Sequence, residues 1–198
     1  MARPFLVAGC VVVALVVADT AAAHSDLAVS TGFYGGLLHP LFVPAHLLVV
    51  AALGLLIGQQ APRWGRAMPF IYVVAIVAGL AAVALAYVPS LTEESLLALT
   101  AVAGLLVALA RPMPSAIGWL LAAGIGLALA LDSPPDEISL SEASVALLGT
   151  ACGATILLLA VVEGASRLTR DWQRIGMRIL GSWIAASALL VLAMRLAK

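Results

Sequence analysis

The sequence predicts an all-α protein of the membrane: a polytopic helix bundle with about six transmembrane helices after a cleaved signal peptide. Of its 198 residues, 64% are hydrophobic and 10% are charged, whereas a soluble domain is about half apolar and about a quarter charged. The mean hydropathy is +1.15. Apolar stretches of about 20 residues, the length that crosses the hydrocarbon core of a bilayer, recur along the chain. These observations exclude an ordinary soluble domain.

The first 23 residues have the pattern of a signal peptide. Arg3 gives a positive start, Phe5–Val17 is apolar, and Ala21–Ala23 supplies the small residues of a cleavage site. We expect cleavage after Ala23, which would make His24 the first residue of a single transmembrane domain over residues 24–198. The alternative is that the leader remains as an uncleaved first helix.

Six membrane spans are expected in the mature chain. They cover residues 32–58, 67–88, 91–110, 115–131, 143–162 and 175–196. The first is interrupted by Pro40 and Pro44, because proline has no amide proton to donate within a helix. Alanine and glycine are frequent in all of them, and such small residues allow helices to approach closely in lipid.

The charges predict how the spans are oriented. With the N-terminus outside, the inner connections contain Arg63, Arg66, Arg111, Arg167, Arg170 and Arg174. Before Arg195, the outer segments contain no lysine or arginine. Because arginine and lysine collect on the cytoplasmic side, this pattern indicates a bacterial inner membrane protein whose mature N-terminus is periplasmic.

Most acidic residues are expected on the outer side. They are Asp26, Glu93, Glu94, Asp132, Asp136, Glu137 and Glu142. Clustered carboxylates would raise the local concentration of cations at this face. The alternative is that the outer connections simply need polar residues.

All three histidines, His24, His39 and His46, are near the start of the predicted mature chain. His39 and His46 are seven residues apart, so they would share one face of a continuous helix. Ionisable side chains inside a membrane usually face the bundle interior or a cavity, and broken helices there often form ion sites. Imidazole suits nickel, copper, zinc and iron, and the candidate ligand is a transient divalent ion of nickel, cobalt, copper or zinc. Two interpretations remain open: a transition-metal site, or two histidines hydrogen-bonded within the bundle.

A second chelating group would arise from signal-peptide cleavage. The free amine and the imidazole of His24, with Asp26 two residues later, could together bind a divalent metal. This hypothesis depends on cleavage after Ala23.

The stretch GFYGGLLHPL, followed by HLL from His46, resembles the first span of the HupE/UreJ family of hydrogenase and urease accessory membrane proteins. The family pattern is G-F-x-x-G-x-x-H-P-L-x-G-x-D-H-L-L. The resemblance implies a cleaved leader, about six spans, and transport of nickel or cobalt, with His39 and His46 as the histidines of the metal site. Ala45 stands where the family has an aspartate.

The family also has a second histidine-rich motif in a later span, whereas no histidine follows His46 here. The corresponding region, residues 129–141, offers Asp132, Asp136 and Glu137. Carboxylates bind divalent metals, but with less selectivity for nickel than imidazole.

These observations support two functional hypotheses. The first is a permease or accessory protein for a divalent transition metal, whose partners are the lipid bilayer and the metal ion. The second, motivated by the missing ligands, is a non-transporting membrane subunit or assembly partner of a larger membrane complex. We expect no enzymatic activity, because the sequence has no nucleophile–base pair, phosphate loop or HExxH motif. The net charge of zero gives no indication of a nucleic-acid partner.

Overall fold

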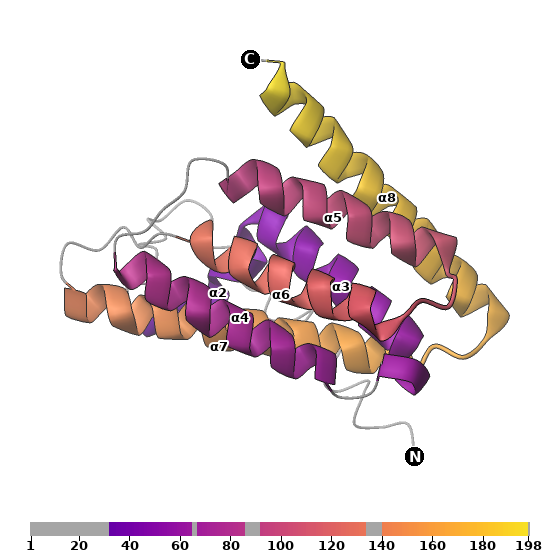
Figure 1. The fold of residues 1–198 in the computed structure, drawn as a ribbon, viewed down its shortest axis with the longest axis horizontal. Helices are drawn as coiled ribbons and strands as arrows, with labels where there is room; N and C mark the ends of the chain where they lie inside the picture. The colour runs from indigo at the N-terminus through magenta and orange to yellow at the C-terminus, as the bar shows by residue number, and fades with distance from the viewer. Residues whose placement is uncertain (1–31, 65–66, 86–91, 134–139, 198) are drawn as a thin grey trace, which may run out of the picture. The chain divides into compact units, whose positions relative to one another are not determined.

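The computed structural model describes residues 32–64, 67–85, 92–133 and 140–197. Within these ranges the chain is helical and has no strand (Figure 1). The helices are α2 (Phe33–Phe42), α3 (Pro44–Trp64), α4 (Ala67–Ala84), α5 (Thr92–Leu109), α6 (Ser115–Leu131), α7 (Leu140–Ser166) and α8 (Asp171–Leu196). The predicted signal peptide lies outside the described residues.

The lengths and compositions of these helices confirm the predicted class of fold, a helical membrane bundle. Among the described helices, α3, α4, α5, α7 and α8 are each long and apolar enough to cross a membrane. The shorter α6 is also apolar over its 17 residues. The described part of the chain therefore has the composition of a protein that lies in a bilayer.

The expected break in the first span is present, and it separates two distinct helices. α2 ends at Phe42 and α3 begins at Pro44, with Val43 in an extended conformation (φ −88°, ψ 110°) between them. A residue that precedes proline is disfavoured in the α conformation, which explains why the break falls at Val43. Pro40, by contrast, is accommodated inside α2. α3 alone has 21 residues and is long enough for a full span.

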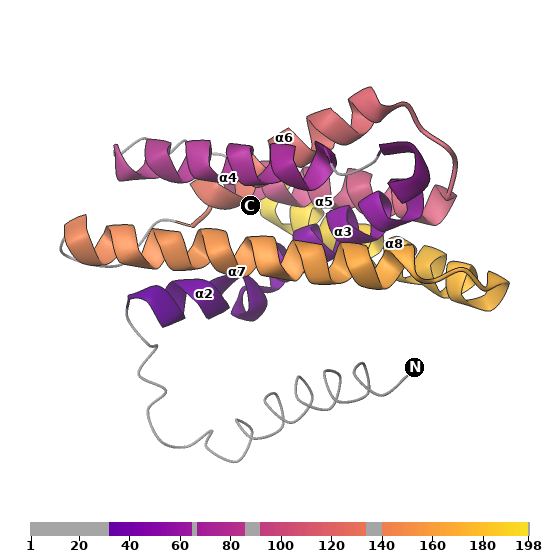
Figure 2. The same cartoon turned by 90° about the horizontal axis from the view of Figure 1, so that it is seen from below.

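α3 is the central helix of the bundle, because it contacts each of the other six described helices. Leu53, Leu56 and Ile57 of α3 are almost completely buried. Around α3, the helix pairs with the most extensive contacts are α5 with α8, α4 with α6, and α2 with α7. Figure 2 shows the short α2 running along α7. The central position of α3 brings both of its ends next to polar residues of other helices.

Glycines allow α2 and α7 to pack with their backbones in contact. A Cβ added at Gly36 would clash with the backbone of Ala146, and a Cβ at Gly149 would clash with the backbone of Phe33. A Cβ at Gly153 would meet the carbonyl of Leu37. Helices in lipid associate through such close approaches of small residues, since the hydrophobic effect does not drive them together there.

Trp64 anchors the end of α3 to the connection between α5 and α6. Its side chain is 4% exposed, and its Nε1–H donates a hydrogen bond to the Met113 carbonyl oxygen at 3.2 Å. We expect Trp64→Phe to lower the free energy of unfolding by about 1 kcal/mol, the net value of one hydrogen bond. The matched control is Trp172→Phe, because Trp172 is 66% exposed, and we expect its effect to stay within about 0.5 kcal/mol. Unfolding in detergent mixtures, followed by circular dichroism, measures both; equal effects would contradict the anchoring role.

Candidate metal-binding site

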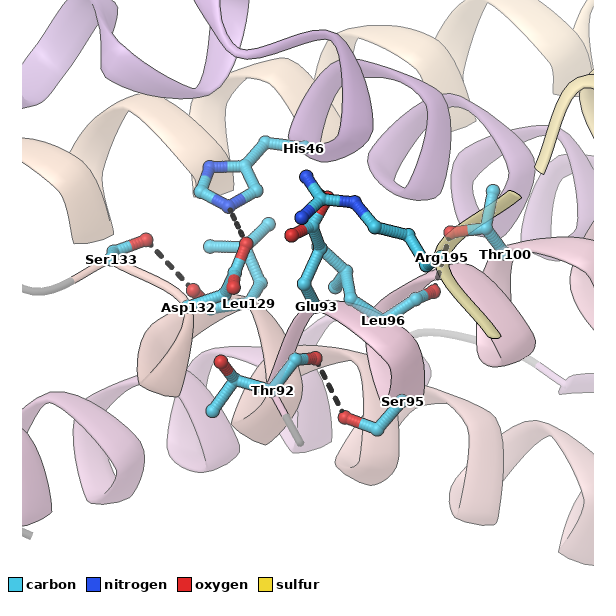
Figure 3. Close-up of polar contacts among 10 residues, drawn as sticks. All are labelled: His46, Thr92, Glu93, Ser95, Leu96, Thr100, Leu129, Asp132, Ser133 and Arg195. Atoms are coloured by element: carbon cyan, nitrogen blue, oxygen red, sulfur yellow. Dashed lines mark hydrogen bonds and ion pairs between the residues drawn. The ribbon is translucent and has the colours of Figure 1, made fainter. Parts of the chain in front are cut away.

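His46 and Asp132 form a buried polar pair between the start of α3 and the end of α6. The Nε2–H of His46 donates a hydrogen bond to Asp132 Oδ2 at 3.0 Å (Figure 3). The His46 side chain is fully buried and that of Asp132 is 18% exposed. Since an ionised carboxylate can only accept hydrogen bonds, this contact places the imidazole proton on Nε2. In the neutral imidazole this leaves the Nδ1 lone pair available, and Nδ1 is buried with no hydrogen-bond partner among the described residues.

His39 brings a second imidazole to the same place from the last turns of α2. The ring centroids of His39 and His46 are 5.1 Å apart, with the planes inclined at 61°. Seven residues of continuous helix would separate their positions by about 10.5 Å along the axis. Because the chain bends at Val43, the two rings lie closer together than they would on a straight helix. The two rings therefore lie close together across a bend between two helices, and not along one face of a continuous helix.

Asp132 lies at the C-terminal end of α6, the negative end of the helix dipole. It is the residue that ends α6, and its backbone N–H bonds to the carbonyls of Ala128 and Ala130. The last carbonyl groups of a helix carry partial negative charge, which adds to the charge of the carboxylate. Ser133 donates to the Leu129 carbonyl at 2.7 Å and so satisfies one of these groups. The Asp132 carboxylate and the C-terminal end of α6 together favour a cation beside His46.

Four of the predicted site residues lie outside the described part of the chain: His24, Asp26, Asp136 and Glu137. Of the others, the structure brings His39, His46 and Asp132 together. Within the described ranges, however, no group of three or more His, Cys, Asp or Glu side chains has an arrangement that could hold a metal ion. The two imidazoles and the carboxylate are therefore neighbours, but they do not make up a complete set of metal ligands.

A second ion pair at this end of the bundle was not expected from the sequence. Arg195 in the last turn of α8 contacts Glu93 in the first turn of α5, with Nη2 and Oε1 2.6 Å apart (Figure 3). Both side chains are partly exposed, and each has the charge that suits its helix end. The available signal was Arg195 itself, the basic residue that departs from the charge pattern of the outer segments.

Ala45 replaces the aspartate that the HupE/UreJ pattern has next to the second histidine, and another carboxylate lies beside that histidine in the structure. Ala45 is followed directly by His46 on α3, and the carboxylate beside His46 comes instead from Asp132, 86 residues further along the chain. The sequence analysis included Asp132 among the candidate ligands and did not predict its contact with His46.

Comparison with known proteins identifies the family of this chain. The family model for HupE / UreJ protein matches residues 12–191, nearly the whole chain. No curated protein and no solved structure matches it. The extent of this match, together with the GFYGGLLHPL segment that carries His39, shows that the chain belongs to the HupE/UreJ family.

Proposed function

We propose that this protein is a permease or accessory protein for a divalent transition metal of the nickel or cobalt type. Membership of the HupE/UreJ family supports a nickel- or cobalt-related role in general. The observation that carries the proposal is the fully buried His46, whose Nε2–H is held by Asp132 while Nδ1 stays available. Metal-binding histidines commonly donate their other ring N–H to a carboxylate in this way, which fixes the ring and raises its basicity as a ligand.

In this proposal the metal is the cargo and binds only in passing. His46 supplies Nδ1, the adjacent His39 supplies a second imidazole, and water completes the coordination. An incomplete site suits transit, because an ion that moves on must be held weakly enough to leave. The site would face the periplasm and the arginine-rich end of the bundle would face the cytoplasm, in keeping with the distribution of positive residues.

Uptake of nickel and cobalt by cells that produce the protein tests this proposal. We expect His46→Ala to reduce uptake to the level of cells without the protein, because it removes the oriented imidazole. His39→Ala should reduce uptake as well. Glu163→Gln is the control, since Glu163 is exposed and pairs with Arg167 at the other end of the bundle. Unchanged uptake in His46→Ala at equal protein level would refute the proposal.

The alternative, a non-transporting subunit or assembly partner in a larger membrane complex, is favoured by one finding. The described residues contain no group of three or more side chains that could hold a metal. The same experiment separates the two functions when it is combined with purification from the membrane. A wild-type protein that supports no metal uptake and copurifies with a stoichiometric partner would establish the alternative.

A further inference from the structure

A cavity of about 380 Å³ lies at the end of α3 that is remote from His46. It is formed by the last turns of α3, the α5–α6 connection and the α7–α8 connection, and we call it the arginine-end cavity. Its polar lining consists of Gln59, Gln60, Arg63, Ser166, Thr169 and Arg174. The volume is in the range of pockets that bind small ligands.

Two buried amide oxygens at this cavity have no hydrogen-bond partner within the described part of the chain: Oε1 of Gln59 and Oε1 of Gln60. Gln60 is 3% exposed, and its Nε2 donates to the Arg111 carbonyl at 2.7 Å. Nε2 of Gln59 donates to the Val107 carbonyl at 3.3 Å. These bonds fix the orientation of both amides, because a flipped amide would set oxygen against oxygen. A buried acceptor without a donor is energetically unfavourable, so both oxygens favour a ligand that carries hydrogen-bond donors.

The backbone of α3 offers a further acceptor at the same place. Pro62 lies inside α3 and has no amide proton to donate to the carbonyl of Gly58, one turn earlier. The Gly58 carbonyl therefore lacks its usual α-helical donor, and it belongs to a residue that lines the cavity.

The charge of the lining is positive. Arg63 of α3 and Arg174 of α8 line the cavity, and none of the lining residues is acidic. Neither arginine forms an ion pair with an acidic side chain of the described residues. Guanidinium groups bind phosphate with paired, charge-assisted hydrogen bonds. The cavity thus combines sites for an anion with acceptors for hydroxyl or amine protons.

We propose that the arginine-end cavity binds the headgroup of phosphatidylglycerol, an anionic membrane lipid. Its phosphodiester would contact Arg63 and Arg174, and its glycerol hydroxyls would donate to the amide oxygens of Gln59 and Gln60. Basic pockets between transmembrane helices on the cytoplasmic side bind anionic headgroups in this manner. A lipid fits this cavity because it lies where the helices end and because its lining also includes the apolar residues Leu168 and Met177.

The neighbouring start of α8 supports the same choice. Trp172 is 66% exposed and Ile175 is 55% exposed, and both are in the first turns of α8, the helix that supplies Arg174. Tryptophan is enriched at the level of lipid headgroups. A lipid whose headgroup occupied the cavity could therefore lay its chains along an apolar surface.

Thermal unfolding of the purified full-length protein in detergent, with lipids added one at a time, tests this inference. We expect phosphatidylglycerol to raise the unfolding temperature. Phosphatidylcholine should have little effect, since its headgroup has a phosphodiester and no hydrogen-bond donor. Phosphatidylethanolamine, which is zwitterionic, should protect less than phosphatidylglycerol. Soluble glycerol phosphate at the same concentration should not protect, because it lacks the lipid chains.

Variants locate the effect. The double variant Arg63→Gln, Arg174→Gln should bind phosphatidylglycerol with an affinity at least about tenfold lower, because it loses charge-assisted hydrogen bonds. Native mass spectrometry measures the fraction of protein with bound lipid. Arg170→Gln is the matched control, because Arg170 is at the same end and does not line the cavity. Equal protection by phosphatidylcholine, phosphatidylethanolamine or glycerol phosphate would overturn the proposal. So would protection by phosphatidylglycerol that persists in the double variant. None of these measurements depends on metal uptake, so failure of the lipid proposal and failure of the transport proposal can be told apart.

Discussion

Gly153→Ala is expected to force α2 away from α7 and to destabilise the protein. A Cβ at Gly153 would collide with the carbonyl of Leu37, and the three nearest atoms all belong to the Leu37 backbone. Backbone atoms inside a helix cannot move aside individually, so the whole of α2 must shift. Overpacking of this kind costs about 1–3 kcal/mol or more, which outweighs the gain of about 1 kcal/mol that alanine has over glycine within a helix.

Gly164→Ala is the matched control on the same helix. Nothing lies within 4 Å of a Cβ at Gly164, so we expect this variant to be unchanged or more stable by up to about 1 kcal/mol. Detergent-induced unfolding compares the two variants directly. Metal uptake gives a second reading, because α2 carries His39 and its displacement would move that ring from His46. A Gly153→Ala protein as stable as Gly164→Ala would show that α2 is not held by backbone contact.

The class of fold followed from composition, but the contacts between helices did not. In a membrane bundle the faces that meet lipid and the faces that meet other helices are both apolar, so hydropathy does not tell which helices pair. From the sequence, the glycines could therefore be interpreted only as general packing residues. Their specific role at Gly36, Gly149 and Gly153 depends on the pairing of α2 with α7, which are about a hundred residues apart in the chain.

The candidate site was predicted in part, for a similar reason. The spacing of His39 and His46 predicted a shared helix face, and the two rings lie close together because the segment bends between them. The pairing of His46 with Asp132 joins residues 86 positions apart, and no local pattern specifies it. The arginine-end cavity combines residues from three distant stretches. The positions of its arginines were evident in the sequence, whereas the unpartnered oxygens of Gln59 and Gln60 became evident only once the helices were packed.

Asp132→Ala is expected to weaken nickel binding by about 10–100-fold, as the loss of a carboxylate that orients a ligating histidine does in metal sites. It should also lower the free energy of unfolding by about 1–3 kcal/mol, because His46 is fully buried and would keep no partner for its Nε2–H. Nickel titration of the purified protein by calorimetry measures the first effect, and detergent-induced unfolding measures the second.

Asp132→Asn separates the two contributions of this carboxylate. An asparagine oxygen can still accept the hydrogen bond from His46 Nε2, so we expect stability to remain close to that of the wild type. The negative charge is lost, so nickel affinity should still fall, by roughly tenfold. Glu163→Gln removes a carboxylate that is exposed and remote from His46, and it should change neither property. If Asp132→Ala lost stability but bound nickel like the wild type, the His46–Asp132 pair would be a structural contact, and the carboxylate would have no part in holding metal.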